Sequence, residues 1–260
     1  RSVPMGAIVQ QIKTLVANGY AEVVLTGVDI TAYGSDLPGR PSLGQLLRRL
    51  LRAVPELPRL RLSSLDAVEI DAELERLLLG EERLMPHLHL SLQAGDDLVL
   101  KRMARRHSRA QAVELCQRLR AGRPDMVFGA DLIAGFPTET EAQFQNSLAL
   151  IDDCGLTYLH VFPYSERPGT PAARMPQVPG HERRRRAALL REKGAAALSG
   201  FLAGQVGNSS RVLLERPGQG RSEQFALIQL EQTATLPENG IVTVDIIEAA
   251  ENHLIGRLAA

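Results

Sequence analysis

Asp131 is the residue whose position most needs a chemical explanation. It interrupts an apolar run, GADLIAG (129–135), which leads through Phe-Pro into TETE, a pattern typical of a helix start. In a second run, HLHLSLQ (87–93), three leucines alternate with polar residues, namely His87, His89, Ser91 and Gln93. If the leucines pack against outer helices, Gln93 and Asp131 point into one interior. A carboxylate beside an amide suits the hydroxyl groups of a ligand, such as those of a ribose.

Structural explanations compete with this chemical one. An isolated aspartate in a strand is often held by backbone amides or by an arginine, and the pattern alone leaves that alternative open. His87 and His89 are expected to pack in the same interior rather than bind a metal, because no third ligand residue stands near them. Cys116 lies on the apolar face of a predicted helix and is expected in the core. With Cys154 it makes too sparse a set for a disulfide framework or a metal site.

Five short β-type runs must position these residues. They cover 21–27, 59–64, 87–93, 126–135 and 157–165, and amphipathic segments lie between them. Thr138 with Glu141 forms a capping-box pattern that predicts a helix ending at Gly155. Ser108 with Gln111 predicts another helix in the same way. The alternation predicts parallel βα units, in a barrel or a doubly wound sheet, with function at the carboxyl ends of five parallel strands.

From about residue 204 the pattern changes. The β-type runs 209–215, 223–231, 240–249 and 252–259 are separated by the turn motifs PGQG (217–220) and PENG (237–240). These features predict a small all-β module, either a barrel or a sandwich. A helix rich in Arg and Ala, 180–203, joins the two parts. Its four consecutive arginines, 183–186, cover a full helical turn, so a solvated surface is expected and RNA contact is the alternative.

The composition excludes several classes of protein. The 30 basic and 30 acidic residues cancel, so the overall charge does not point to nucleic acid or to a membrane surface. No apolar run reaches the ~20 residues of a spanning helix, and no signal peptide is visible. A cytoplasmic protein is therefore expected. Its 260 residues allow one large core and a small second domain.

Five motifs, in this order along the chain, resemble those of the radical S-adenosylmethionine (SAM) methylthiotransferases. They are LTGVDITAYG (25–34), RLSSLDAVEI (61–70), HLHLSLQAGDDLVLKRMARRH (87–107), FGADLIAGFPTETE (128–141) and HVFPYSERPGTPAARMP (160–176). The first motif is most similar to the branch that modifies N6-threonylcarbamoyladenosine beside the tRNA anticodon. The resemblance implies an α/β fold: a partial (βα)6 TIM-like barrel over 1–179, a connecting helix over 180–203 and a TRAM-type RNA-binding β module over 204–260.

This resemblance also implies cofactors and partners. In the family, a reduced [4Fe-4S] cluster cleaves SAM to a 5′-deoxyadenosyl radical, a second cluster supplies sulfur, and another SAM methylates it. The product carries a methylthio group at C2 of the modified adenine. The implied partners are tRNA, at its anticodon stem-loop, and an electron donor, with no membrane. The family's Cys-x3-Cys-x2-Cys motif and first barrel strand are expected upstream of Arg1. Neither cysteine of this chain replaces that motif, so the chain alone is expected to be inactive.

Site residues follow from the matched motifs. Gln93 and Asp131 fall where relatives hold the ribose hydroxyls of SAM, and Arg105 falls where they hold the methionine carboxylate. These three side chains are expected to line one cavity. Gly27 and Val28 fall where backbone carbonyls hold the methionine amino group.

Two further positions are implied with less direct support from the strand pattern. Ser64 matches a polar SAM contact of radical SAM coproporphyrinogen oxidases, although strand alternation points Ser63 inward instead. Gly135 is expected to let a ligand approach the backbone closely.

Alternatives remain open at this stage. One is the same chemistry on isopentenyladenosine in tRNA or on a ribosomal protein. Others are a catalytically dead RNA-binding or scaffold protein that begins near Arg1, and a phosphate-binding βα-barrel enzyme. The module from Gly204 onward is acidic, so only local RNA contact is expected. The candidate residues for that contact are Arg183, Arg184, Arg185, Arg186, Arg211 and Arg221.

Overall fold

The computed structural model describes residues 1–231 and 239–259. Its helices are α1 (Met5–Ala17), α2 (Leu43–Ala53), α3 (Ala72–Gly80), α4 (Asp97–Arg102), α5 (Arg109–Gly122), α6 (Glu141–Cys154) and α7 (Gly180–Ala203), with 3-10 turns at Ala67–Glu69 and Ala172–Arg174. Its strands are β1 (Glu22–Leu25), β2 (Arg59–Leu62), β3 (His87–Gln93), β4 (Val127–Ala134), β5 (Leu156–Pro163), β6 (Ser209–Arg216), β7 (Gln219–Arg221), β8 (Leu227–Leu230), β9 (Ile241–Ala249) and β10 (Leu254–Leu258). No helix in these described residues is long and apolar enough to cross a membrane.

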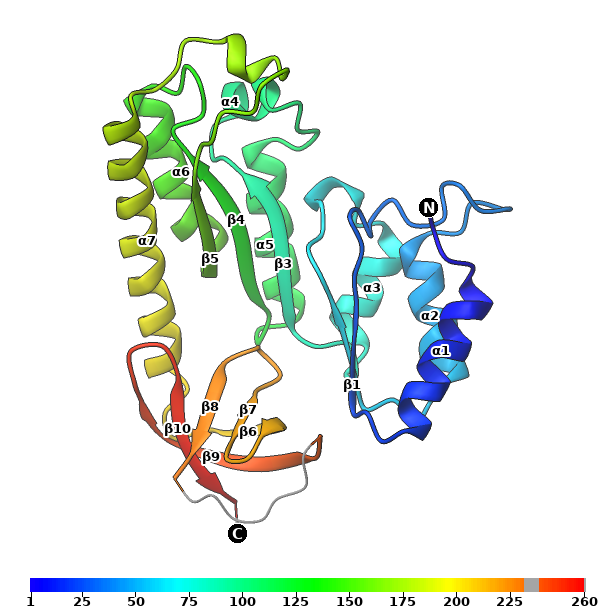
Figure 1. Ribbon diagram of the computed structural model, residues 1–260. Helices are drawn as coiled ribbons and strands as arrows, with labels where there is room; N and C mark the ends of the chain where they lie inside the picture. Colours follow the sequence, from blue (N-terminus) through cyan, green and yellow to red (C-terminus); the bar gives the residue numbers. More distant parts are fainter. Residues whose placement is uncertain (232–238, 260) are drawn as a thin grey trace.

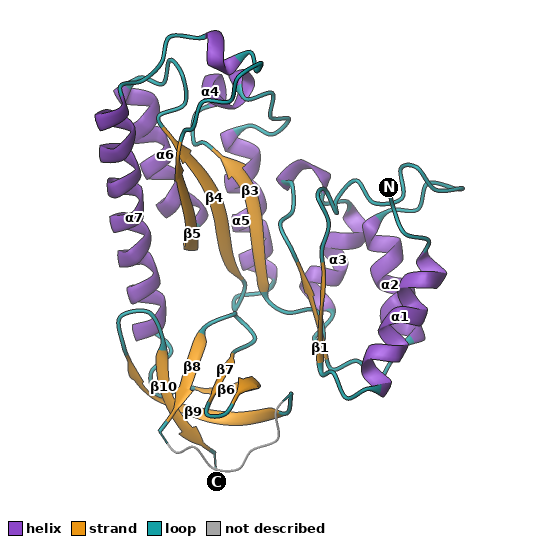
Figure 2. Cartoon of the chain, in the orientation of Figure 1, coloured by secondary structure: helices purple, strands orange, loops and turns teal. Residues whose placement is uncertain are grey.

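The five expected strands are present and pair in parallel, but they form two sheets rather than one. β1 pairs with β2, and β4 lies between β3 and β5. Isolated bridges, Leu60 to Leu84 and Leu65 to Leu90, connect the two sheets. In Figure 2 the arrows of β3, β4 and β5 point away from the small barrel, so their carboxyl ends meet at the opposite end of the domain.

One hydrophobic core joins the two sheets to their helices. Helices α5, α6 and α7 cover one side of β3–β5, while α1, α2 and α3 accompany β1 and β2 (Figure 1). The shared core runs from Ile12 of α1 to Leu190 of α7 and includes the alternating leucines of β3. The predicted position of these leucines against the outer helices is therefore confirmed. Cys116 and Cys154 are fully buried in the same core.

The helix termini confirm one capping box and correct the other. Ser108 and Gln111 cap α5 reciprocally, as predicted. For α6 the box consists of Thr140 and Gln143, not Thr138 and Glu141. Thr138 cannot serve because its backbone is left-handed, with φ of 67°, whereas a residue that begins a helix in this way is extended. Gly155 ends α6 as predicted, in the left-handed conformation.

The C-terminal part is a closed barrel with the strand order β10-β8-β7-β6-β9. The four β-type runs expected there each contain one of these strands, while β7 was not predicted because PGQG was taken only as a turn. Of the predicted turn PENG, Pro237 and Glu238 lie outside the described residues. The barrel has its own core, to which α7 contributes Leu202.

The small barrel closes the amino-terminal end of the parallel sheets, which we call the floor (Figure 1). Arg59 of β2 donates to the carbonyl of Arg211, at 2.6 Å, and Arg61 donates to the carbonyls of Ser222 and Glu223. Both arginines are almost completely buried. Because their partners are backbone oxygens of the small barrel, these guanidinium groups join the two parts of the molecule.

An aromatic contact completes the floor. The ring of Phe225 stacks on His87, with 4.9 Å between ring centroids, and Arg61 lies over the same phenyl ring. The hydroxyl of Tyr158 donates to the carbonyl of Gln224. Burial lowers the pKa of His87 to about 3, with the Arg61 charge adding to the effect, so this imidazole is neutral. His87 therefore packs in the interior, as the sequence predicted.

The arginine run 183–186 is only in part the solvated surface that was expected: Arg184 and Arg185 are exposed, Arg183 is half-buried, and the expectation is wrong for Arg186. Arg186 is buried and bonds Glu139 Oε2 at 2.9 Å. Arg183 donates to the carbonyl of Tyr164, and Arg185 pairs with Glu182. Only Arg184 is exposed with no ion pair among the described residues. Because the side chains of one helical turn point to several sides, Arg183 and Arg186 can contact the domain and hold α7 against it.

Candidate functional site

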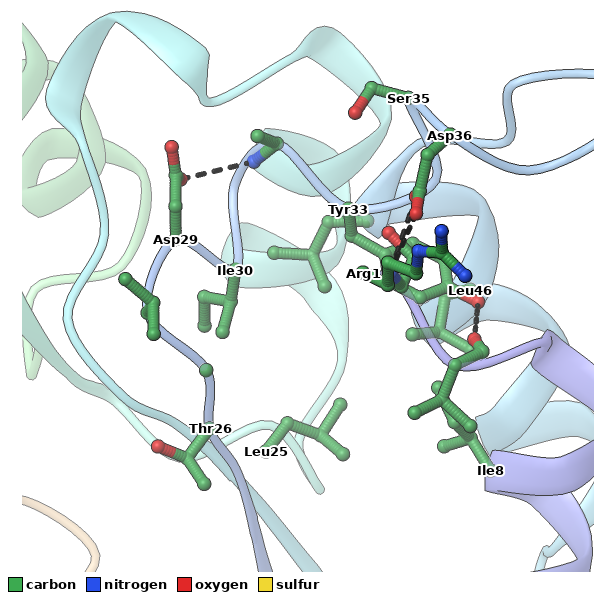
Figure 3. Close-up of a pocket in the computed structure, with 16 residues that line it drawn as sticks. Arg1, Ile8, Leu25, Thr26, Asp29, Ile30, Tyr33, Ser35, Asp36 and Leu46 are labelled. Atoms are coloured by element: carbon green, nitrogen blue, oxygen red, sulfur yellow. Dashed lines mark hydrogen bonds between the residues drawn. The ribbon is translucent and has the colours of Figure 1, made fainter.

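Three hollows open at the carboxyl ends of the parallel strands, and the first lies beside β1. This β1 hollow has a volume of about 490 Å³, and its walls include the apolar side chains of Ile8, Leu25 and Leu46 (Figure 3). Gly27 and Val28, expected near the methionine amino group, line it as well. The side chain of Val28 is fully exposed.

The second hollow, here named the arginine hollow, contains Arg105 and Ser64. It has a volume of about 280 Å³ and also includes Val28 and Ser91. Arg105 Nη2 donates to Asp66 Oδ2 at 3.0 Å and to the Ser91 carbonyl at 2.7 Å. These bonds hold the guanidinium in place and leave Nη1 without an acceptor among the described residues. A fixed guanidinium with a free nitrogen is suited to a carboxylate.

Asp66 is the anion that fixes this arginine. It lies close to His107 and to Arg105, with 3.7 Å between Asp66 Oδ1 and His107 Nδ1. The neighbouring His107 contributes most to lowering the pKa of Asp66, and Arg105 lowers it further against the opposing effect of burial. Asp66 is therefore ionised, and sequence analysis missed it. Its place in the motif RLSSLDAVEI was the only signal.

The third hollow, here named the Asp131 cavity, is the largest of the three. It has a volume of about 590 Å³ and is lined by Gln93 and Asp131 together with Ile133, Phe162 and Tyr164. Gln93 closes β3 with a left-handed backbone, at φ of 66°, where the register between β3 and β4 shifts. A non-glycine residue in this conformation is uncommon, and strained residues of this kind cluster at ligand-binding and active sites. The predicted convergence of Gln93 and Asp131 is confirmed.

Two histidines meet Asp131 beside this cavity. His89 Nε2 lies 3.0 Å from Asp131 Oδ1, and His160 Nδ1 lies 3.2 Å from the same oxygen. Burial acts to raise the pKa of Asp131, but the two imidazoles outweigh it, so that the pKa is lowered and the carboxylate is ionised. The expectation that no third ligand-type residue stands near His89 is wrong. His160 lies on β5, 29 residues after Asp131 in the sequence, so the sequence alone did not reveal that these two residues are in contact.

The structure does not bring all the predicted residues together. Arg105 lines the arginine hollow and not the Asp131 cavity, so the expectation of a single cavity is wrong for this residue. It bonds to Asp66 and to the β3 carbonyl of Ser91, and both contacts hold it in that hollow. At Gly135 the close approach is made by α7, because a Cβ there would lie 2.5 Å from Cγ of Arg183. Its φ of 73° also favours glycine.

The cysteines do not fit an iron-sulfur cluster. A cluster needs accessible thiolates, and this chain has only Cys116 and Cys154. Both are buried between α5 and α6. Contact with Cys154 and burial raise the pKa of the Cys116 thiol, which keeps it protonated. The charged and polar groups of the three hollows fit a polar organic ligand instead.

Comparisons with known proteins show to which family the sequence is similar. The model of the radical SAM superfamily matches residues 1–151. The chain is 55% identical over 254 residues to the threonylcarbamoyladenosine tRNA methylthiotransferase MtaB of Rickettsia prowazekii (strain Madrid E), covering 98% of this chain and 60% of that protein. It is 38% identical over 269 residues to the tRNA-2-methylthio-N(6)-dimethylallyladenosine synthase of Erythrobacter litoralis (strain HTCC2594), covering 98% of this chain and 58% of that protein. The chain thus spans about three fifths of each relative.

A solved structure supports the fold independently. The radical S-adenosylmethionine methyltransferase TsrM from Kitasatospora setae superposes with a TM-score of 0.52 at 17% sequence identity. The match covers 65% of this chain and 33% of that one. At this identity the likeness concerns the fold alone. An α/β domain with a small β barrel attached is consistent with it.

Proposed function

The chain belongs to the radical SAM superfamily, and we propose that it provides the SAM-binding barrel and the RNA module of a tRNA methylthiotransferase. The reaction would place a methylthio group on C2 of N6-threonylcarbamoyladenosine, next to the anticodon. The 55% identity to the MtaB relative, against 38% to the dimethylallyladenosine synthase, supports this branch. The isopentenyladenosine branch is the second candidate, because that relative also aligns over 98% of the chain.

The observation that carries the proposal is the arrangement of the Asp131 carboxylate. It lies in the carboxyl-terminal half of β4 and shares with Gln93 a cavity at the end of the strands where βα folds bind their ligands. Oδ1 is engaged by two histidines, while no described residue donates to Oδ2. An ionised carboxylate with a free oxygen beside an amide suits the hydroxyl groups of a ribose.

The remaining site residues take the parts of SAM that lie beyond the ribose. Arg105, already fixed by Asp66, would hold the methionine carboxylate from the arginine hollow. Ser64 and Val28 border the same hollow, and the backbone of Gly27 and Val28 would receive the amino group. Gly135 would act indirectly, by allowing Arg183 to pack behind the end of β4.

When bound, SAM would supply the radical that acts on the substrate, once an electron from the reduced cluster cleaves it, and a second SAM molecule would supply the methyl group. The residues of this chain bind and orient SAM and exclude water from its adenosine. Phe162 and Tyr164 provide apolar walls beside Asp131. The two parallel sheets would belong to a partial (βα)6 barrel over 1–179, with 180–203 as a connecting helix. Residues 204–260 would form a TRAM-type module that contacts the tRNA anticodon stem-loop. The setting would be cytoplasmic, with a separate electron donor.

The function is tested by analysing modified nucleosides in tRNA. A strain that lacks the gene is complemented with the complete wild-type gene, with Asp131→Ala or with Asp152→Ala, an exposed carboxylate on α6 that pairs with Lys193. We expect the 2-methylthio derivative of N6-threonylcarbamoyladenosine to return with wild type and Asp152→Ala, and to fall at least tenfold with Asp131→Ala, the scale for losing a bond to a charged group. Return of the dimethylallyladenosine derivative instead would favour the second branch. Return of neither would contradict the proposal.

A further inference from the structure

We propose that His89 and His160 are positioning residues for Asp131, and that the three side chains act as one hydrogen-bonded unit that presents a single carboxylate oxygen to the ligand. This inference rests on the proposed function, because the ligand is the ribose of SAM. The unit draws one residue from each strand of the second sheet: His89 from β3, Asp131 from β4 and His160 from β5.

The shared oxygen fixes which nitrogen of each imidazole donates a hydrogen bond. His89 Nε2 and His160 Nδ1 both lie within hydrogen-bond distance of Asp131 Oδ1, at 3.0 and 3.2 Å. An ionised carboxylate only accepts hydrogen bonds, so both nitrogens must carry a hydrogen. His89 Nε2 and His160 Nδ1 therefore act as donors to Asp131 Oδ1. With Oδ1 occupied twice, the carboxylate cannot rotate freely, and Oδ2 remains the acceptor for a ligand.

The strand register builds this unit. His160 is the direct cross-strand neighbour of Asp131, and His89 is the neighbour of Gly129. At Gly129 a Cβ atom would lie 2.7 Å from Nδ1 of His89. The glycine therefore makes the space in which the His89 ring lies, and any other residue at this position would push the ring away. Such a clearance is expected where the ring orientation matters.

The two histidines differ in accessibility, which separates their contributions. The side chain of His89 is only 11% exposed, whereas that of His160 is 62% exposed. Their rings lie close together, with 4.6 Å between centroids. His89 holds Asp131 from within the domain, and His160 holds it from the solvent side. Loss of either leaves Oδ1 with one donor and allows the carboxylate to turn.

The same three groups also form a ligand set that transition metals accept, two imidazoles and a carboxylate. Their ligand atoms lie within 4.8 Å of one another. In the hydrogen-bonded arrangement described above, however, each nitrogen that faces the carboxylate already has a partner, and the carboxylate is satisfied at Oδ1. The hydrogen-bonded unit accounts for the geometry without a cation. A metal centre is therefore an outcome that the experiment must be able to detect.

The experiment compares two kinds of histidine substitution in the complete gene product loaded with its cluster. His89→Leu and His160→Leu remove the N–H donors. His89→Gln places an amide nitrogen near the position of Nε2, and His160→Asn places one near the position of Nδ1. Calorimetric titration with SAM should show each Leu variant binding about 3- to 10-fold more weakly, the effect of one hydrogen bond, and the amide variants near wild type. Gly129→Ala should weaken binding as well, although it removes no polar group.

A double-mutant cycle reports whether the effect passes through Asp131. In an Asp131→Ala background, His160→Leu should cause no further loss of SAM affinity, because there is no carboxylate left to position. Urea midpoints of all variants separate folding defects from binding defects. His181→Leu, at an exposed histidine near the start of α7, is the matched control and should bind like wild type.

Each outcome decides the question. Leu variants that bind SAM as tightly as wild type overturn the positioning role while the proposed function stands. Leu and amide variants that are equally impaired, with affinity lost to a chelator and restored by Zn²⁺ or Fe²⁺, overturn it in favour of a metal centre. Wild-type protein that binds no SAM overturns the proposed function itself. Rescue by the amide variants alone supports the inference.

Discussion

The two ends of the parallel strands use similar polar side chains for opposite purposes. At the floor, Arg59, Arg61 and His87 are buried under the small barrel. At the mouth, where the carboxyl ends lie, Asp131 and Arg105 keep atoms free toward open hollows. Polar groups at the floor bond to other parts of the protein and stabilise the fold. Those at the mouth are held in place by some of their atoms and keep other atoms free to bind a ligand. This division is what βα folds show in general.

Backbone strain shows the same contrast. Phe225 at the floor is left-handed, with φ of 73°, and it gains a ring stack on His87 and contacts with the guanidinium groups of Arg61 and Arg221. Gln93 at the mouth has a comparable φ of 66°, yet none of the described residues bonds its side chain. Strain without a protein partner supports the hypothesis that a ligand binds at Gln93.

The largest effect should come from breaking the floor with Arg61→Met. Arg61 bonds both oxygens of Glu22, at 2.9 and 3.0 Å, and is 2% exposed. Its loss leaves Glu22 and two carbonyls of the small barrel without this donor. We expect the free energy of unfolding to fall by about 3 kcal/mol, the lower end for a broken buried pair, because Arg59 lies 3.8 Å from Glu22 and compensates in part.

The control for this variant is Arg48→Met. Arg48 pairs with Glu73 at 2.9 Å but its side chain is 67% exposed, so its loss should cost at most about 1 kcal/mol. Both values follow from urea denaturation monitored by circular dichroism. If Arg61→Met and Arg48→Met lower the free energy of unfolding equally, the contacts of Arg61 at the floor do not stabilise the fold more than an exposed ion pair. The proposed difference between the two ends of the strands would then be wrong.

A smaller effect should appear as a pH dependence that originates at His87. Burial holds its folded pKa at about 3, below the ordinary 6.5, so the unfolded chain binds a proton first. The contribution of neutral His87 to the free energy of unfolding is therefore present above pH 6.5 and is lost as the pH falls below that value. Between pH 6.5 and 5 the loss should be about 2 kcal/mol.

The variant His87→Phe isolates this contribution. Phenylalanine preserves the stack on Phe225 and cannot take up a proton. The other groups that face His87, namely Arg61, Arg221, His89 and His160, are unchanged. Urea midpoints from pH 5 to 7 should therefore slope less steeply for His87→Phe than for wild type, while His181→Gln should keep the wild-type slope. Parallel slopes for wild type and His87→Phe would show that His87 does not titrate in this way.

Arg59 and Arg61 at the floor also show what could not be predicted from the sequence. The run RLRL was predicted only as part of a strand, and all four of its residues are buried. The strand itself was predictable from local periodicity. The burial of Arg59 and Arg61 depends on the small barrel, which follows more than 140 residues later, and no local pattern encodes that contact. Elements were thus predictable, and docking between them was not.

The mouth shows a similar limit. Gln93 and Asp131 were predicted together because alternation along each strand determines which side chains share a face. His160 was missed because its meeting with Asp131 depends on the register between β4 and β5, which alternation alone does not specify. Two overlapping segments, Thr138 to Glu141 and Thr140 to Gln143, both fit the capping-box pattern, so the pattern alone does not tell which of them begins α6. Only the left-handed backbone at Thr138, which the fold imposes, decides between them.

The smallest effect, and the sharpest test of the mouth, should come from Gln93→Gly. Glycine adopts a φ of 66° without strain, so the variant should be more stable than wild type by about 0.5 kcal/mol, after the greater entropy of glycine in the unfolded chain is counted. SAM binding should nevertheless weaken about tenfold, because the amide that faces the Asp131 cavity is gone. Thr138→Gly is the matched control, since Thr138 has a φ of 67° and does not line that cavity. It should gain similar stability and keep wild-type affinity for SAM in calorimetric titration. If Gln93→Gly also keeps wild-type affinity for SAM, the Gln93 side chain does not bind SAM. The left-handed backbone at Gln93 is then unrelated to ligand binding.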